Sequence, residues 1–207
     1  LITKAIELPK KGPRMPSKNS GFFDQYGNLK PVTCWDFLAS EHDLAMAGDR
    51  SIAVYSGGVF WNGDSLKFRK IVSEALSNHY KPEHENTLLK FGLAELKVAG
   101  VEIPFRQPRL ILNFLNGLLD VETMELQPHT PSHRTLIQFP FIWDPAAECP
   151  TFDHWLQSVL PNQGDVLPDV SSQMLDQTRQ PTQLLFLYGP GRSGKSTFLR
   201  ILRWIAG

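Results

Sequence analysis

The feature of the sequence that most restricts the fold is a glycine-rich stretch, Gly189 to Thr197, which reads Gly-Pro-Gly-Arg-Ser-Gly-Lys-Ser-Thr. An unbroken apolar run at 184–188 precedes it, which is typical of a strand buried on both faces. The apolar residues that follow recur at helical spacing: Phe198, Ile201, Leu202 and Ile205. The order of strand, glycine loop and helix predicts the beginning of an α/β domain.

This stretch fits the pattern G-x-x-x-x-G-K-[ST], in which backbone N–H groups and a lysine hold phosphates. Its glycines lack a Cβ and can take positive φ, so the backbone can approach a phosphate closely, and the helix N-terminus adds free donors. We expect Lys195 to contact the β- and γ-phosphates of ATP and the Ser196 hydroxyl to bind Mg²⁺. The predicted nucleotide-binding residues are Gly189, Pro190, Gly191, Arg192, Ser193, Gly194, Lys195, Ser196 and Thr197. The alternative is a Gly/Ser turn that binds nothing.

The sequence after Thr197 is short, and the first residue is Leu1 rather than Met. Efficient ATP hydrolysis also needs an acidic Mg²⁺ partner, a water-positioning residue and an arginine finger, which in this pattern follow the loop. We therefore expect a fragment of a longer protein, with no catalytic residue within this chain and little ATPase activity of its own.

Composition limits the class of protein. A length of 207 residues with 42% hydrophobic content suits one or two domains with a real core. The formal net charge is zero, so no overall basic field indicates nucleic acid or a membrane. Cys34 and Cys149 are far apart and form no C-x-x-C pattern, which favours a reducing compartment. With no apolar run near 18 residues, we expect a cytoplasmic protein with no membrane partner.

The N-terminal half is predicted to be mostly helical. Residues 1–31 read as a basic linker broken by prolines, which either contacts phosphate backbones or is simply solvated. Thr33 to Asp36 resembles a capping box that opens a helix through Ala47. Residues 51–62 read as a hairpin with its turn at Ser56-Gly57-Gly58. The hairpin aromatics Tyr55, Phe60 and Trp61 could stack on bases, or pack the hairpin onto helices, which we favour.

Further elements follow the hairpin. Asp64 is expected to cap a helix with the apolar stripe Phe68, Ile71, Val72, Ala75 and Leu76, and a second helix runs from Pro82 to Lys97 with Gly100 beyond. Strands are expected at 110–114, 118–121 and 124–126, with a tight turn at Asn116-Gly117. Helices are expected at 150–161 and, more weakly, at 167–174. His129 and His133 have Pro131 between them, so we do not expect a metal site there.

Several motifs, taken in order, resemble the poxvirus-type and phage or plasmid primase-helicases. They are Tyr55-Ser56-Gly57-Gly58-Val59-Phe60-Trp61, the run from Leu112 to Asp120, Leu126 to Pro131, Trp143-Asp144-Pro145-Ala146, Cys149-Pro150-Thr151-Phe152, and Tyr188 to Leu199. The resemblance covers roughly residues 35–207. It implies a superfamily 3 DNA helicase, a ring-shaped homo-oligomeric motor that uses ATP and Mg²⁺ on single-stranded or forked DNA.

The resemblance also implies how the chain is divided. Residues 32–180 would form a mostly helical accessory domain with small β-hairpins. Residues 181–207 would be the first strand, loop and helix of an AAA+-like ATPase domain, so the whole is of the α/β class. Two alternatives stay open: a nucleotide-binding ATPase that does not translocate on DNA, and a non-enzymatic DNA-binding or interaction module.

Overall fold

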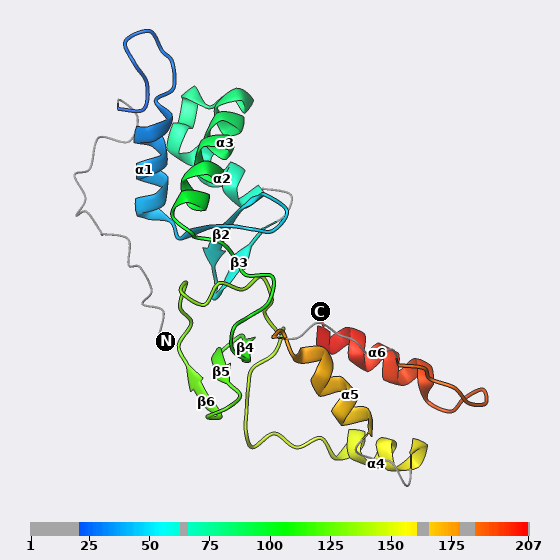
Figure 1. Cartoon of the computed structure of the whole chain (residues 1–207). Helices are drawn as coiled ribbons and strands as arrows, with labels where there is room; N and C mark the ends of the chain where they lie inside the picture. The colour runs from blue at the N-terminus through cyan, green and yellow to red at the C-terminus, as the bar shows by residue number, and fades with distance from the viewer. Residues whose placement is uncertain (1–20, 63–65, 161–165, 179–184, 207) are drawn as a thin grey trace. The chain divides into compact units, whose positions relative to one another are not determined.

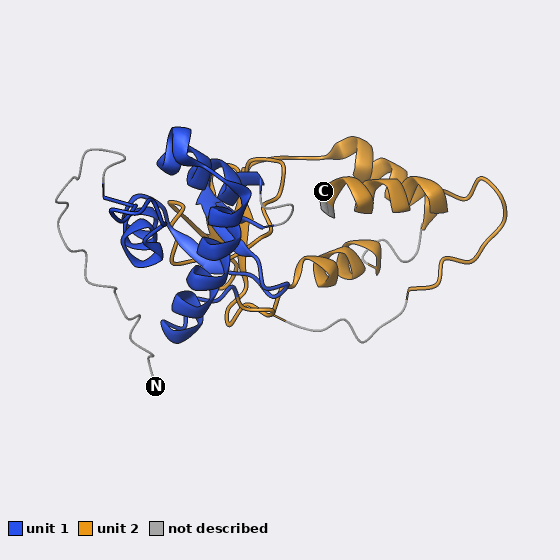
Figure 2. Ribbon diagram, turned by 90° about the horizontal axis from the view of Figure 1, so that it is seen from above, with its two compact units in different colours: residues 1–103 blue, residues 104–207 orange. Residues whose placement is uncertain are grey.

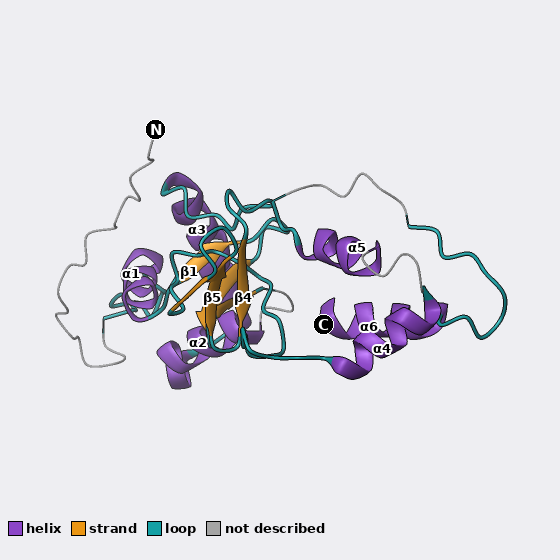
Figure 3. Cartoon of the chain, turned by 90° about the horizontal axis from the view of Figure 1, so that it is seen from below, coloured by secondary structure: helices purple, strands orange, loops and turns teal. Residues whose placement is uncertain are grey.

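The computed structural model describes residues 21–62, 66–160, 166–178 and 185–206. The chain divides into two compact units, unit 1 within residues 1–103 and unit 2 within residues 104–207, coloured separately in Figure 2. Within the described ranges the secondary structure comprises six α-helices and two three-stranded antiparallel sheets (Figure 3). The expectation of a mixed α and β chain with small hairpins is therefore confirmed.

In unit 1, the second and third of the described helices pack against the sheet, and the first helix packs on these two (Figure 1). The elements in chain order are α1 (Pro31–Glu41), β1 (Leu44–Met46), β2 (Ile52–Ser56), β3 (Val59–Trp61), α2 (Leu66–Leu76), the 3₁₀ turn η1 (Ser77–His79) and α3 (Pro82–Val98). The strand order is β1-β2-β3. One main core cluster lies between the helices and the sheet, and its fully buried members include Leu38, Phe68, Val72 and Leu88.

The first helix differs from its prediction at both ends. Helix α1 begins at Pro31. Proline suits the first helical position because an N–H there would have no acceptor within the helix, and proline has no N–H. No side chain caps it, so the predicted capping box at Thr33 does not form. The prediction of helix through Ala47 is wrong, since Leu44–Met46 pairs with β2 as strand β1. The pairing, rather than local propensity, determines the conformation of this segment.

The hairpin prediction for residues 51–62 is confirmed. Strands β2 and β3 pair with Ser56 opposite Val59, so only Gly57 and Gly58 lie in the turn. Their φ angles of 63° and 88° are both in the left-handed region, as a two-residue type I′ turn requires. Side chains are strained at such angles, and the two glycines remove this cost.

The two longer helices of unit 1 follow the predicted pattern. All five apolar residues of the predicted α2 stripe are buried, while the predicted cap Asp64 lies outside the described residues. Helix α3 ends as predicted before Gly100, whose φ is 64°. The N–H of Gly100 donates to the Lys97 carbonyl and that of Val101 to the Leu96 carbonyl. These two hydrogen bonds together form a Schellman cap. Glycine is favoured at this position because it has no Cβ.

Unit 2 contains the second sheet and three helices. The elements are β4 (Ile111–Phe114), β5 (Gly117–Asp120), β6 (Glu125–Gln127), α4 (Pro150–Val159), α5 (Val166–Leu175) and α6 (Lys195–Ala206). The strand order is β4-β5-β6, close to the strands expected from sequence. The tight turn is displaced by one residue, because Phe114 pairs with Gly117 and the loop is therefore Leu115-Asn116.

The segment from Ile137 to Trp143 runs beside β4 and is bonded to it. The N–H of Phe139 donates to the Asn113 carbonyl, and the N–H of Leu115 donates to the Phe141 carbonyl. The Asn116 side chain exchanges two hydrogen bonds with the backbone of Trp143. These hydrogen bonds pair backbone groups along the edge of β4, and they bring Phe139 and Phe141 against Phe114.

Within the described ranges, no helix has the length and apolar character needed to span a membrane. The predicted division of the chain into residues 1–31, 32–180 and 181–207 stays a prediction. In residues 21–30, which belong to the predicted linker, Phe22 is buried in the main core cluster of unit 1.

Candidate phosphate-binding loop

The loop predicted to bind phosphate lies at the N-terminus of α6. Residues 190–194 form turns and bends, and helix α6 begins at Lys195, as expected from sequence. The N–H of Phe198 donates to the Gly194 carbonyl at 2.9 Å, which makes this the first bond of the helix. The three preceding N–H groups therefore have no acceptor within the helix. They lie at the positive end of the helix dipole, where an anion is favoured.

The Lys195 ammonium is folded back over the loop. Its Nζ donates to the backbone carbonyls of Gly189 at 3.0 Å and Pro190 at 2.6 Å, and to the Ser193 hydroxyl at 2.8 Å. Three neutral acceptors thus hold one positive charge in the middle of the loop. A phosphate oxygen carries negative charge and would be a stronger acceptor for the same ammonium.

Two glycines keep the loop in this shape. A Cβ built on Gly189 would lie 3.3 Å from Ser193 Oγ and 4.0 Å from Lys195 Nζ, so the missing side chain leaves the loop interior open. Gly194 has φ of 85°, and a Cβ there would lie 2.8 Å from Val159 Cγ1 of α4. Gly194 is therefore required by both backbone conformation and packing.

The remaining predicted residues lie on the outer side of the loop. Arg192 takes a positive φ of 64°, whereas Gly191, which we expected to use this freedom, does not. Ser196 and Thr197 are exposed in the first turn of α6, so the Ser196 hydroxyl is accessible for the predicted Mg²⁺ role. The loop thus brings together one ammonium, the hydroxyl side chains of Ser193, Ser196 and Thr197, and the free helix N–H groups. These donors and this open interior fit a phosphate group.

The strand expected before the loop is not formed in its described part. Residues 185–188 have no strand conformation, and Leu184 lies outside the described residues. Phe186 is 81% exposed and Tyr188 fully exposed, although the prediction placed them in a buried central strand. A central strand needs hydrogen-bonded neighbours on both sides, and the two described sheets are built from other segments. This part of the fold prediction is therefore not supported.

The loop is supported instead by helices. A cluster of buried residues joins α4, α5 and α6: Leu156, Leu167, Phe198 and Leu202. Trp155 and Leu187 pack against this cluster. The apolar stripe of α4 was visible in the sequence, but nothing in its spacing indicated that it would contact the loop glycine Gly194.

The aromatic residues of the first hairpin separate into two groups. The rings of Tyr55 and Phe60 lie 5.2 Å apart, and Phe60 is buried with Ala45, Ala47 and Ala53. Packing is therefore the role of these two rings, but they pack against the sheet and the segment after α3 rather than onto helices as predicted. Trp61 is 48% exposed. Its Nε1 donates to the Ser56 carbonyl, and Lys67 Nζ lies 4.1 Å from the ring centroid. Base stacking stays a prediction, and Trp61 is the most exposed of the three rings.

The two histidines of unit 2 have different surroundings. His129 Nε2 is hydrogen bonded to the Phe114 carbonyl at 2.8 Å, which ties the segment after β6 to β4. Burial lowers the pKa of His133 below its usual range. Among the described residues, no group of three His, Cys, Asp or Glu side chains could hold a metal ion.

Sequence reasoning missed the buried charged groups. Glu85 lies in the first turn of α3, yet it is buried, pairs with Arg69 at 3.0 Å and accepts a hydrogen bond from Tyr80 at 2.6 Å. Asp120 is also buried and pairs with Arg109 at 2.8 Å. Arg69 lies 16 residues before Glu85, and Arg109 lies 11 residues before Asp120. Local spacing in the sequence could therefore not have identified these two ion pairs.

Comparison with known proteins gives one family. Residues 54–161 match the family model described as D5 N terminal like, a domain found in poxvirus D5 and phage primase-helicase proteins. The match covers just over half of the chain, from β2 through α4, and ends before the loop. No curated protein matches the chain.

Proposed function

Because the chain belongs to the D5 N-terminal-like family, we propose that it is part of an ATP-dependent superfamily 3 DNA helicase or primase-helicase of a phage, plasmid or integrated element. The family match supports the association with primase-helicases, and the loop at the start of α6 supports the nucleotide. The single observation that carries the proposal is the Lys195 ammonium, which is held by Gly189, Pro190 and Ser193 at the N-terminus of a helix.

In this function the loop binds the phosphates of ATP. The N–H groups at the start of α6 donate to phosphate oxygens, and Lys195 exchanges its carbonyl acceptors for the charged phosphate. Ser196 contributes its hydroxyl to the Mg²⁺ that accompanies the nucleotide. When bound, Mg·ATP supplies the free energy of phosphoryl transfer that a helicase uses, and this chain's own residues position the triphosphate.

Calorimetric titration with Mg·ADP tests this proposal. Loss of the ammonium removes a charged hydrogen bond, which contributes roughly 1.5–3 kcal/mol, so Lys195→Ala should weaken binding about tenfold to a hundredfold. Arg203→Ala is the matched control, because it removes a positive charge from the exposed side of the same helix without touching the loop. Equal affinities for the wild type and Lys195→Ala would leave a Gly/Ser turn as the better interpretation.

Titration with and without Mg²⁺ tests the role of Ser196. We expect Mg²⁺ to strengthen ADP binding in the wild type and to have a smaller effect in Ser196→Ala, because the variant lacks the hydroxyl ligand. Thr197→Ala removes the neighbouring exposed hydroxyl and should retain the full Mg²⁺ effect. The same response in both variants would assign no metal role to Ser196.

The proposed macromolecular partner is DNA, single-stranded or forked, with a homo-oligomeric ring for the intact protein in the cytoplasm of its host. The basic residues of 1–31 carry the expected contact with phosphate backbones. Since Phe22 belongs to the core of unit 1, the useful deletion removes residues 1–20 only. We expect this deletion to weaken binding of fluorescent single-stranded DNA and to flatten its salt dependence. Unchanged binding would direct attention to Trp61 and Lys67.

A further inference from the structure

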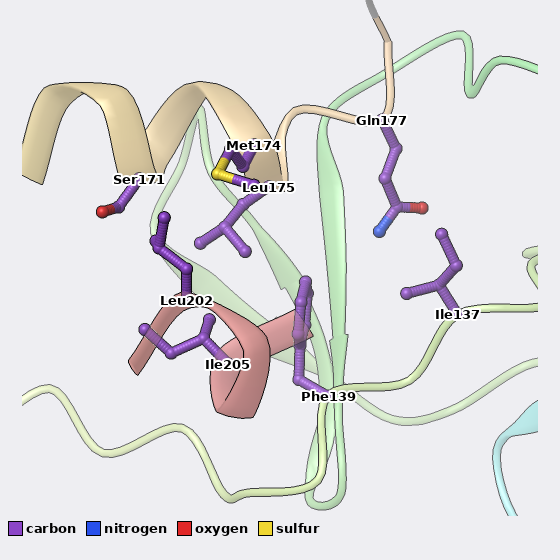
Figure 4. Close-up of a pocket in the computed structure, with 8 residues that line it drawn as sticks. All are labelled: Ile137, Phe139, Ser171, Met174, Leu175, Gln177, Leu202 and Ile205. Atoms are coloured by element: carbon purple, nitrogen blue, oxygen red, sulfur yellow. The ribbon is translucent and has the colours of Figure 1, made fainter. Parts of the chain in front are cut away.

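An open hollow lies along one flank of α6, and it begins at the phosphate-binding loop. Its volume is about 250 Å³, and it is lined by Thr197, Arg200, Ile201 and Trp204. The helix packs on the rest of unit 2 through other residues. Figure 4 shows Leu202 and Ile205 on the side of α6 that faces Leu175 of α5 and Phe139. The hollow is therefore a part of the helix surface that these packing contacts leave uncovered.

Thr197 links the hollow to the loop. Its N–H is one of the three at the start of α6 that have no acceptor within the helix, and its side chain borders the hollow. With a rise of 1.5 Å per residue, Ile201 lies about 6 Å and Trp204 about 10.5 Å farther along the helix axis. A group attached to a phosphate at the Thr197 N–H is therefore within reach of both side chains.

Trp204 presents a flat surface that is held in place. Its ring centroid lies 5.9 Å from that of Phe141, and the two ring planes differ by only 14°. Phe141 is itself packed against Phe114 of β4. Only one face of the indole can meet Phe141, and Trp204 stays 68% exposed. An aromatic ring that is fixed on one face and open on the other is a surface on which a nucleobase can stack.

Arg200 supplies the charge of the lining. It is exposed, and within the described ranges no carboxylate pairs with its guanidinium. Residues four apart are neighbours on a helix surface, so Arg200 and Trp204 border the same space. A guanidinium is planar and stacks on bases and other aromatic faces. An aromatic plane, a planar cation and the aliphatic Ile201 together suit a nucleoside better than a purely apolar ligand.

We propose that this hollow is the nucleoside subsite of the loop. The base stacks on the open face of Trp204 and contacts Ile201, and the Arg200 guanidinium adds a cation–π contact to the base. The subsite rests on the proposed function, because phosphates bound at Lys195 and the helix N-terminus bring the nucleoside to this flank. It assigns the preference for a nucleotide over inorganic phosphates to Trp204 and Arg200.

Calorimetry with two ligands separates the subsite from the loop. Mg·ADP carries a base, whereas inorganic pyrophosphate with Mg²⁺ occupies the loop alone. Trp204→Leu should weaken ADP binding roughly fivefold to a hundredfold through the lost stacking, and it should leave the pyrophosphate affinity unchanged. Trp204→Phe keeps an aromatic plane and should retain most of the ADP affinity. Equal weakening of both ligands in Trp204→Leu, or undiminished ADP binding, would overturn the subsite and leave the loop in place.

The contribution of Arg200 has a matched control on the same helix. Arg200→Ala should weaken ADP binding roughly twofold to fivefold through the lost cation–π contact. Arg203→Ala removes an equal charge from a residue outside the lining and should not weaken it. Equal affinities of the two variants for ADP would contradict the role of Arg200. If the wild type binds neither pyrophosphate nor ADP, the proposed function itself fails, and the subsite fails with it.

NMR of the unsubstituted chain tests the stacking without a variant that must fold. With ¹⁵N-labelled tryptophan, Mg·ADP should shift the indole N–H resonance of Trp204, and pyrophosphate with Mg²⁺ should not. The indole of Trp35, which is buried in unit 1, is the internal reference and should not move with either ligand. The Trp204 resonance is identified by its absence from the spectrum of Trp204→Leu. A Trp204 indole that does not respond to saturating ADP, or that responds equally to pyrophosphate, would overturn the proposal.

Discussion

The two units bury their apolar residues differently. Among its described residues, unit 1 places fourteen buried residues in one cluster between its helices and its sheet, beside a small second cluster around Phe60. The described part of unit 2 has two smaller clusters, one around Phe114 and Phe139 and one that joins α4, α5 and α6. Several of its large apolar side chains stay at the surface, among them Phe105 at 94% exposed and Trp204 at 68%.

The difference shows which structural features need distant partners. In unit 1, amphipathic helices bury their stripes against a sheet that forms from neighbouring segments of the chain. In unit 2, the loop and helix α6 are formed, but residues 185–188 before them, the described part of the apolar run, are not a strand. A helix makes its hydrogen bonds within itself, whereas a strand makes them with another strand. The start of α6 is therefore encoded locally, whereas the expected strand needs partner strands.

The largest expected contrast between the units is in thiol reactivity. Cys34 is fully buried in unit 1, and burial raises the pKa of its thiol from 9.0 to about 12, while Cys149 of unit 2 is exposed. A pKa shift of this size lowers the thiolate fraction about a thousandfold at neutral pH. We expect Cys149 to be alkylated rapidly by iodoacetamide and Cys34 only on unfolding. Mass spectrometry of wild type and Cys149→Ser would show this, and rapid native labelling of Cys34 would contradict the core of unit 1.

Replacing phenylalanine by alanine should have effects of very different size on the stability of the two units. Phe68 is 1% exposed in the unit 1 core, whereas Phe186 of unit 2 is 81% exposed. Phe68→Ala should lower the free energy of unfolding by roughly 3–5 kcal/mol through lost burial and a cavity. Phe186→Ala should change it by less than about 0.5 kcal/mol. Urea denaturation followed by circular dichroism measures both, and a large effect of Phe186→Ala would show that this residue is packed in solution.

Glycine contacts provide a second comparison of packing. In unit 1, a Cβ on Gly92 of α3 would overlap the ring of Trp35, whereas a Cβ on Gly48 meets nothing within 4 Å. Gly92→Ala should therefore lower the free energy of unfolding by roughly 1–3 kcal/mol, and Gly48→Ala should have little effect. Similar midpoints of urea unfolding for the two variants would mean that α1 and α3 do not pack as described.

The smallest effect concerns pH. Because burial lowers the pKa of His133, protonation is easier in the unfolded chain than in the folded one. Stability should thus be unaffected well above the ordinary histidine pKa of 6.5 and should decrease as pH falls below it toward the folded pKa. Melting temperatures at pH 7.5 and 5.5 should differ less in His133→Gln than in the wild type. An unchanged difference would exclude His133 as the source.

The elements that could be predicted from sequence are those with local signals. The stripe of α2, the Gly57-Gly58 turn, the glycine that ends α3 and the helix after Lys195 all depend on residues within a few positions of each other. Propensity, turn chemistry and periodicity act at this range. The prediction that Lys195 is the phosphate-binding lysine also depended on short-range spacing, namely that of the pattern G-x-x-x-x-G-K-[ST].

The features that sequence reasoning missed depend on contacts between distant residues. Strand β1 was read as helix because its pairing with β2 cannot be seen in its own residues. The segment beside β4 is held by Asn116, which contacts Trp143, 27 residues away. The support of the loop by Trp155 and Val159 has the same character, since it is a packing contact with Gly194. Tertiary contacts decided each of these cases.

The central claim is that Gly189 to Thr197 form a phosphate cradle, and NMR of the loop amides tests it most directly. With ¹⁵N-labelled glycine, addition of Mg·ADP should shift the amide resonances of Gly189, Gly191 and Gly194, while Gly48 and Gly100 in unit 1 should not move. Adenosine, which lacks phosphates, should produce none of the loop shifts. Unchanged loop resonances at saturating Mg·ADP, or equal shifts with adenosine, would contradict the claim.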